Sequence, residues 1–187
     1  MKKVEHGKTF DRNAANPPAF EIFHNTVTEG YPEHWHTAIE IIMPTRGEYE
    51  VVVGKDSYNL KEGDIIMINS GVVHGMRFVS QGERIVMLVE PGCVENQEEM
   101  ETIFLRLPAI YFKKEDEEDP FYLFLRSQIL ELVREYDNEG AVMTHRICTG
   151  LKELFSEFGR KGFSDANAQN TFGAMKQQEY IEAVLSV

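Results

Sequence analysis

The sequence predicts a mainly β fold with α-helices towards its C-terminal end: a small β-barrel followed by an antiparallel helical hairpin. Short apolar segments alternate with turn residues from residue 20 to residue 90, a spacing typical of a sandwich or a barrel. Between residues 122 and 158 the apolar residues follow helical spacing instead. Three histidines and one glutamate also fall in or beside the predicted strands, and they suggest a binding site.

The bulk properties favour one compact domain with extra elements, because the chain has 187 residues of which 42% are hydrophobic. No apolar run is long enough for a membrane span, and no secretory signal follows Met1, so we expect a cytoplasmic protein without a membrane partner. Cys93 and Cys148 are far apart and predict inert structural thiols rather than a disulfide framework. The formal net charge of -12 disfavours nucleic-acid binding by this chain alone.

The N-terminal residues 1–18 are polar and end in two prolines, so we expect an arm with little regular structure. It is either a floppy terminus or an arm that folds over a bound ligand. The strands that follow are predicted at 20–22, 37–43, 49–53, 58–60, 65–68, 74–79 and 84–89. The segment 65–68 is continuously apolar, which predicts burial on both of its faces.

Helical patterns follow the barrel. A short helix is predicted at 98–107, and a charged loop at 113–120 leads to two longer helices at 122–136 and 143–158. Because a short segment ending in Gly140 joins them, the two helices should form an antiparallel hairpin that packs on the barrel, on a second subunit, or on both. Residues 161–173 are typical of a linker, and 177–187 predict a further helix without a cap. The natural chain is expected to continue, although a true C-terminus fits as well.

The segment 34–40 carries the main candidate site. In an extended segment His34, His36 and Glu40 share one face, and Trp35 points to the other, where a core position is expected. His74 follows another apolar strand. Three imidazoles and a carboxylate are a sufficient ligand set for Zn, Ni, Fe or Mn. Alternatively, the same four side chains bind a sugar or an acid directly through hydrogen bonds.

Further candidates for binding a ligand have less support. Tyr49, Met67 and Met76 can line a pocket in the barrel, although each is also an ordinary packing residue. His24 can approach the barrel mouth, or it is an ordinary strand histidine. Barrel-facing positions mix acidic, imidazole, aromatic and thioether groups, so sugars, aromatic acids and small amines all remain open as effectors.

The spacing of these residues resembles the two motifs of the cupin family over roughly residues 20–90. The first motif is matched by Gly30, His34, His36, Glu40 and Gly47, and the second by Gly63, Gly71 and His74. Two positions depart from the second motif, where Asn69 replaces the usual proline and Phe78 the usual terminal asparagine. The resemblance implies a jelly-roll barrel with the histidines and the glutamate at its mouth.

More narrowly, the chain resembles the N-terminal half of AraC-type transcriptional regulators. The resemblance implies an arm (1–18), a cupin barrel (19–95), a helical dimerisation region (96–160), and a linker with the first helix (161–187) of an absent helix-turn-helix domain. It implies a non-enzymatic homodimer that senses a small molecule and binds DNA only through the missing domain. The alternatives are a metal-dependent cupin enzyme, such as a dioxygenase or an isomerase, and a simple binding or storage cupin.

Overall fold

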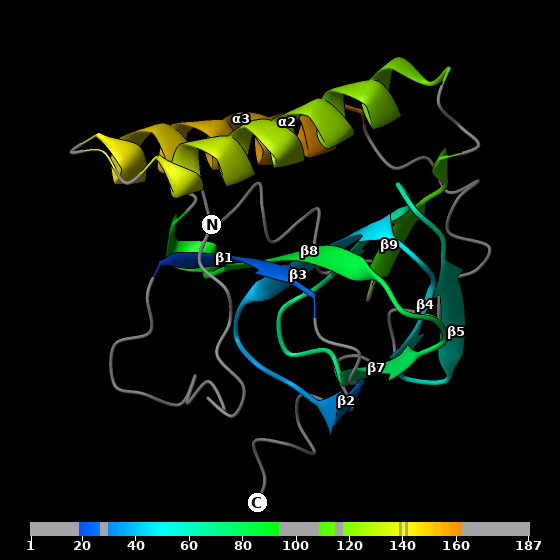
Figure 1. Cartoon of the computed structure of the whole chain (residues 1–187). Coiled ribbons are helices and arrows are strands. Elements are labelled where there is room, and N and C mark those ends of the chain that lie inside the picture. Colours follow the sequence, from blue (N-terminus) through cyan, green and yellow to red (C-terminus); the bar gives the residue numbers. More distant parts are fainter. Residues whose placement is uncertain are drawn as a thin grey trace, which may run out of the picture.

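A computed structural model describes residues 19–26, 30–93, 109–114, 118–138, 140 and 142–161. Within these residues two antiparallel sheets face each other, and two long helices cover one of them (Figure 1). The predicted fold class, a mainly β jelly-roll-like barrel with C-terminal helices, is confirmed. The predictions for the arm, for the helix at 98–107 and for the linker and last helix lie outside the described residues.

The nine described strands divide between the two sheets. The first sheet has the order β1 (Phe20–Asn25), β8 (Glu83–Val89), β3 (Ile39–Arg46), β6 (Ile65–Ile68) and β9 (Ala109–Phe112). The second has the order β2 (Tyr31–His34), β7 (His74–Phe78), β4 (Tyr49–Val53) and β5 (Asp56–Leu60). Every pairing is antiparallel, and a short 3-10 helix, η1 (Pro91–Cys93), follows β8.

The five-stranded sheet is apolar on both faces, because its strands separate the barrel interior from the helices. On β3, Ile41 and Met43 pack in the cluster that contains the helices, whereas Ile42 packs inside the barrel. On β6, Met67 faces the helices and Ile66 faces the interior. All four residues of β6 are buried, which confirms the prediction of a strand buried on both faces.

The helices α2 (Pro120–Asp137) and α3 (Met143–Lys161) form the predicted hairpin and lie side by side over the five-stranded sheet (Figure 1). The start of α2 is set by Asp119, whose side chain accepts the backbone N–H of Phe121, and by Pro120 in the first turn. Tyr122 donates a buried hydrogen bond of 2.8 Å to the carbonyl oxygen of Gly63. This contact fixes α2 to a turn of the barrel.

Three expectations need correction. The segment 34–40 is not one strand: β2 ends at His34, and residues 35–38 cross from the four-stranded sheet to β3 in the other sheet. Trp35 lies in this crossing and is 50% exposed, so it is not a core residue. The strand β9 was not predicted, since the sequence analysis ended the barrel at residue 95, but it completes the sheet by pairing with β6. None of the described helices has the length and apolar composition that crossing a bilayer requires.

Candidate metal centre

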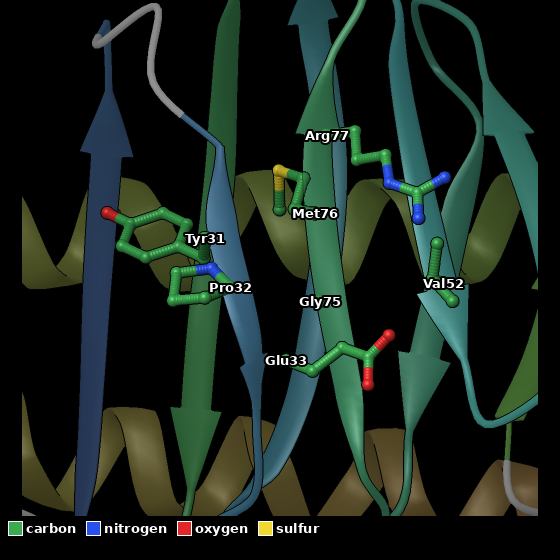
Figure 2. Close-up of a pocket in the computed structure, with 7 residues that line it drawn as sticks. All are labelled: Tyr31, Pro32, Glu33, Val52, Gly75, Met76 and Arg77. Atoms are coloured by element: carbon green, nitrogen blue, oxygen red, sulfur yellow. The ribbon is translucent and has the colours of Figure 1, made fainter.

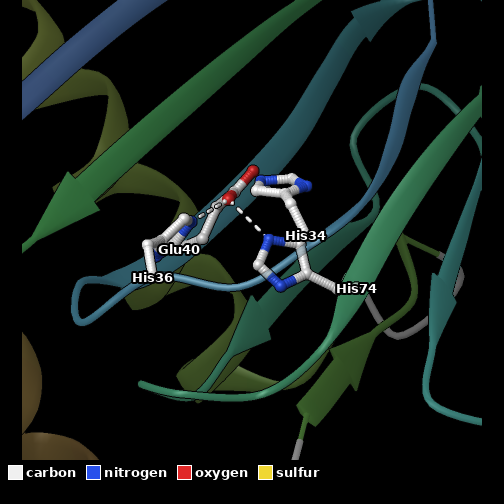
Figure 3. Close-up of side chains that lie close together, drawn as sticks. All are labelled: His34, His36, Glu40 and His74. Atoms are coloured by element: carbon white, nitrogen blue, oxygen red, sulfur yellow. Dashed lines mark hydrogen bonds and ion pairs between the residues drawn. The ribbon is translucent and has the colours of Figure 1, made fainter. Parts of the chain in front are cut away.

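Four side chains from three strands and one loop converge at one end of the barrel. His34 ends β2 and lies opposite His74, the first residue of β7. The loop carries His36, and Glu40 follows on β3 with its side chain turned inward (Figure 3). The ligand atoms of these four residues all lie within 4.8 Å of one another. The change of sheet between β2 and β3 therefore brings together histidines that a flat strand would hold further apart.

The carboxylate of Glu40 is the centre of the cluster. Its Oε2 atom lies 2.9 Å from Nε2 of His36 and 2.9 Å from Nε2 of His74. Dashed lines mark both contacts in Figure 3. Glu40 is 7% exposed and His74 3%, whereas His36 is half-buried and His34 exposed. The cluster is thus closed by the barrel on one side and open to solvent at His34.

Each histidine of the cluster is oriented by a backbone carbonyl. The Nδ1 atoms of His34, His36 and His74 lie 2.9, 2.9 and 2.8 Å from the carbonyl oxygens of Pro32, Ala38 and Val72. Because a carbonyl oxygen only accepts, each Nδ1 must carry the proton. The neutral tautomer then leaves each Nε2 free to act as a metal ligand, which is the outer-shell arrangement usual for metal-binding histidines.

The same hydrogen bonds impose a charge problem on the metal-free cluster. A proton or a cation must lie between Oε2 of Glu40 and each of the two Nε2 atoms, since otherwise only acceptors would meet there. Protons at both places make imidazolium ions of His36 and His74 around one buried carboxylate. Buried excess charge is costly. One divalent cation would satisfy all four ligand atoms, so the cluster can hold a metal ion.

Electrostatics in the cluster favour an ionised Glu40. Burial alone would raise the pKa of Glu40, but the hydrogen bonds from His36 and His74 outweigh it and hold that pKa well below its ordinary range. Burial would likewise lower the pKa of His74, but its hydrogen bond and charge attraction to Glu40 raise it. Partial burial lowers the pKa of His34, opposed mainly by its hydrogen bond to the backbone carbonyl of Pro32.

The other predicted ligand-binding residues do not share this cluster. Tyr49 and Met76 face the barrel interior, where they pack with apolar neighbours. Met67 is on the opposite face of its sheet, against the helices, so it does not line the interior. His24 lies beside Thr45 and Glu83, in a cleft between the barrel and α2 of about 460 Å³. Of the alternatives left open by the sequence, Met67 fits an ordinary packing residue, and His24 fits a strand histidine that lies apart from the cluster.

Arg84 is the polar residue that the sequence analysis missed. It is on β8, is 0% exposed, and places its guanidinium 4.8 Å from the ring centroid of Tyr49 and 5.5 Å from that of Tyr31. It pairs with Pro44 of the neighbouring strand β3. Along β8 it lies on the same face as Val86 and Leu88, which point inward. In the sequence Arg84 stands at the start of an apolar strand, where a charged side chain is expected to be exposed to solvent.

A separate groove of about 370 Å³ is present on β2, β7 and β4 (Figure 2). Val52, Gly75 and Arg77 line it, and these positions alternate with the inward-facing residues of their strands. The groove is therefore on the outer surface of the four-stranded sheet. None of the four cluster residues lines it.

The family model described as "Cupin domain" matches residues 25–90. Apo ToxT K231A from Vibrio cholerae strain SCE256 is similar in structure with a TM-score of 0.50 and 11% identity, covering 78% of this chain and 58% of ToxT. A Bacillus subtilis oxalate decarboxylase matches with a TM-score of 0.33 and 19% identity, over 37% of this chain and 20% of the decarboxylase. A cupin-2 domain protein from Shewanella frigidimarina matches with a TM-score of 0.36 and 16% identity, over 41% of this chain and 76% of that one.

A comparison with curated proteins gave no match. This chain spans 58% of the length of the ToxT chain, and at this level of identity the similarity shows the fold alone. The matched segment, 25–90, contains all four residues of the cluster and seven whole strands, β2 to β8, together with the last residue of β1. Together with the two facing antiparallel sheets, this match identifies residues 25–90 as a cupin domain.

Proposed function

We propose that this chain is the effector-sensing and dimerisation part of an AraC-type transcriptional regulator. A small molecule binds at the open end of the barrel, at the cluster of His34, His36, Glu40 and His74. Its binding changes the position of the α2–α3 hairpin, and a DNA-binding domain elsewhere in the regulator responds. The resemblance of the cluster's spacing to cupin motifs, and the barrel-plus-hairpin arrangement, support this proposal.

One observation carries the proposal: the strand β3 joins the cluster to the hairpin. Glu40 projects from the inner face of β3 into the cluster, while its neighbours Ile39 and Ile41 project from the outer face into the core shared with α2 and α3. Around Glu40 the strand β3 is paired on both sides, with β6 and with β8, so a shift on one of its faces also moves the other. A ligand that binds one position of β3 more tightly therefore biases the position of the helices.

The fold similarity to ToxT supports the regulatory assignment. ToxT is a regulator of the AraC family, and the similarity extends over 78% of this chain, beyond the cupin domain itself. In the proposed organisation residues 1–18 form an arm over the ligand, 19–95 the sensing barrel, 96–160 the dimerisation helices, and 161–187 a linker. Two copies associate through the hairpin.

We also propose that the cluster binds a divalent transition metal, with Zn, Ni, Fe and Mn as candidates. The carbonyl-bound Nδ1 atoms and the converging Nε2 atoms support this assignment. The metal would supply a Lewis-acidic contact for an oxygen or nitrogen atom of the effector at the open side beside His34. If no metal binds, the same imidazoles contact the effector directly.

The test is to measure binding and its effect on the helices in one experiment. Protein purified without chelator or nickel affinity resin is analysed for metal content, and then screened by thermal shift against small sugars, carboxylic acids and amines. Amide hydrogen exchange is recorded with and without the hit. We expect slower exchange in α2 or α3 on binding, and no effect in Glu40→Gln. His145→Gln, an exposed histidine on α3, is the matched control. Binding that leaves the helices and the oligomeric state unchanged would refute the sensing role.

A metal-dependent enzyme is the second candidate. The observation in its favour is that the cluster is open at His34, as a catalytic metal site requires. Turnover of a candidate substrate by metal-loaded protein, lost in Glu40→Gln, would support this function over the sensor.

A further inference from the structure

The two cysteines of the chain meet at the junction between the barrel and the helical hairpin. The Sγ atoms of Cys93 and Cys148 are 3.3 Å apart although the residues are separated by 55 positions in sequence. Cys93 ends η1, directly after the last strand of the cupin domain, and Cys148 is in the second turn of α3. Their separation in the sequence predicts two distant, inert thiols, whereas the structure places them in contact.

Both cysteines are held by well-defined neighbours. The N–H of Cys93 donates 2.9 Å to the carbonyl oxygen of Glu90, and the N–H of Glu90 donates 2.9 Å to that of Ala19. Cys148 follows Ile147, which is fully buried, and both thiols pack against the main apolar core. A disulfide has an S–S length near 2.05 Å, so the sulfurs need to approach by only about 1.3 Å, within reach of small side-chain rotations.

We propose that Cys93 and Cys148 form a reversible disulfide that clasps α3 to the end of the barrel. Both side chains are partly exposed, so a low-molecular-weight disulfide such as glutathione disulfide can reach them. The clasp joins the end of the sensing barrel to the hairpin, and it is independent of whether the histidine cluster binds a metal or an effector.

The chemistry is a thiol–disulfide exchange in two steps. The Cys148 thiolate attacks one sulfur of glutathione disulfide, which breaks that S–S bond and releases one glutathione thiolate. Cys93 then attacks the Cys148 sulfur of the mixed disulfide, the second glutathione leaves, and it takes up the proton of the Cys93 thiol. The two cysteine sulfurs are oxidised together by two electrons, and one glutathione disulfide is reduced to two glutathiones.

The order of the steps follows from the surroundings of Cys93. Burial and the neighbouring thiol raise the pKa of Cys93 to about 12, although Lys152 opposes this. Cys93 is therefore a thiol at neutral pH and a poor first nucleophile. Once Cys148 carries glutathione, the Cys93 sulfur is already beside the sulfur that it must attack, so proximity compensates for its low thiolate fraction.

The test is oxidation of the full chain in glutathione buffers. Because the chain has only 2 cysteines, any intramolecular disulfide must join this pair. We expect the intact mass to fall by about 2 Da, both thiols to become unreactive, and dithiothreitol to reverse both changes. The oxidised protein should melt at a higher temperature than the reduced protein, because the cross-link restricts the unfolded chain.

Cys93→Ser and Cys148→Ser are matched controls that nearly keep the size of the side chain and cannot form the disulfide. Cys93→Ser should take up one glutathione at Cys148, whereas Cys148→Ser, which keeps only the poorly nucleophilic Cys93, should react much more slowly. Neither variant should show a rise in melting temperature. If either variant folds poorly, the result for the wild-type protein alone decides the test. The proposal is overturned if the wild type carries two glutathiones or forms only intermolecular dimers. It is equally overturned if the internal disulfide forms without raising the melting temperature, because then the disulfide does not stabilise the attachment of α3 to the barrel.

Discussion

Glu40 and His74 lie 34 positions apart and on different sheets, yet their side chains meet at 2.9 Å inside the barrel. The contact links the two sheets at this end of the barrel, because it ties β3 of the five-stranded sheet to β7 of the four-stranded sheet. It also defines the proposed binding centre. A change at either residue should therefore affect both ligand binding and the joining of the two sheets.

Removing one ligand should strongly weaken metal binding. We expect His74→Ala to lower the affinity for Zn²⁺ or Ni²⁺ by about 100-fold or more, since even outer-shell changes cost 10- to 100-fold. Competition with a chromophoric chelator measures the affinity. His145→Ala, which removes an exposed imidazole from α3, should leave it unchanged. Equal affinities for the wild type and His74→Ala would show that His74 is not a ligand.

The stability of the metal-free protein should depend on pH through Glu40 and His74. The pKa of Glu40 is lowered from 4.5, so its contribution is present above pH 4.5 and is lost as the pH falls through the folded value. The pKa of His74 is raised from 6.5, so its contribution is present below pH 6.5 and is lost as the pH rises through the folded value. The stability difference between wild type and Glu40→Gln should thus be largest between pH 4.5 and 6.5.

Urea unfolding of both chelator-treated proteins from pH 4 to pH 9 would measure this difference. Taking the difference removes most of the contribution of His34, whose lowered pKa acts in the opposite direction. With saturating metal the trend of the wild type should reverse above pH 6.5, because protons and metal compete for the same imidazoles. A difference that does not vary with pH would contradict the assigned hydrogen bonds.

The sequence was sufficient for the fold class because the barrel strands and the helices have different periodicities. It also grouped His34, His36, Glu40 and His74, which the structure brings within 4.8 Å. That grouping assumed that residues 34–40 form one extended strand. The four residues converge instead because residues 35–38 cross from one sheet to the other. Alternation of residue types looks the same in a strand and in a crossing, so the local pattern could not distinguish them.

Features that depend on distant contacts were not predictable in the same way. The segment 65–68 is apolar throughout, so its pattern could not reveal that Met67 faces the helices rather than the barrel interior. The contact between Cys93 and Cys148 depends on how α3 docks, which no local pattern encodes. Arg84 was missed because a buried arginine is rare and is stabilised here by Tyr31 and Tyr49, from other strands.

Arg84 should be a strong determinant of stability. Its fully buried guanidinium lies over the rings of Tyr49 and Tyr31, so truncation removes these contacts and leaves a cavity. We expect Arg84→Ala to lower the free energy of unfolding by about 2–5 kcal/mol. Arg77→Ala, which removes an exposed ion pair with Glu50, should change it by less than about 1 kcal/mol. Similar urea midpoints for the two variants would contradict this role.

Gly82 should tolerate no side chain, because it lies where two turns of the barrel come close. A Cβ atom at this position would be 2.2 Å from the carbonyl oxygen of Arg46 and 2.8 Å from the hydroxyl of Tyr49. The first of these is backbone, so Gly82→Ala must push the turns apart, and we expect a loss of about 1–3 kcal/mol in the free energy of unfolding. Gly92→Ala is the matched control, since nothing lies within 4 Å of a Cβ there, and it should stay within about 0.5 kcal/mol of the wild type. Urea unfolding at one pH measures both variants, and a Gly82→Ala protein as stable as Gly92→Ala would show that the two turns are not in close contact.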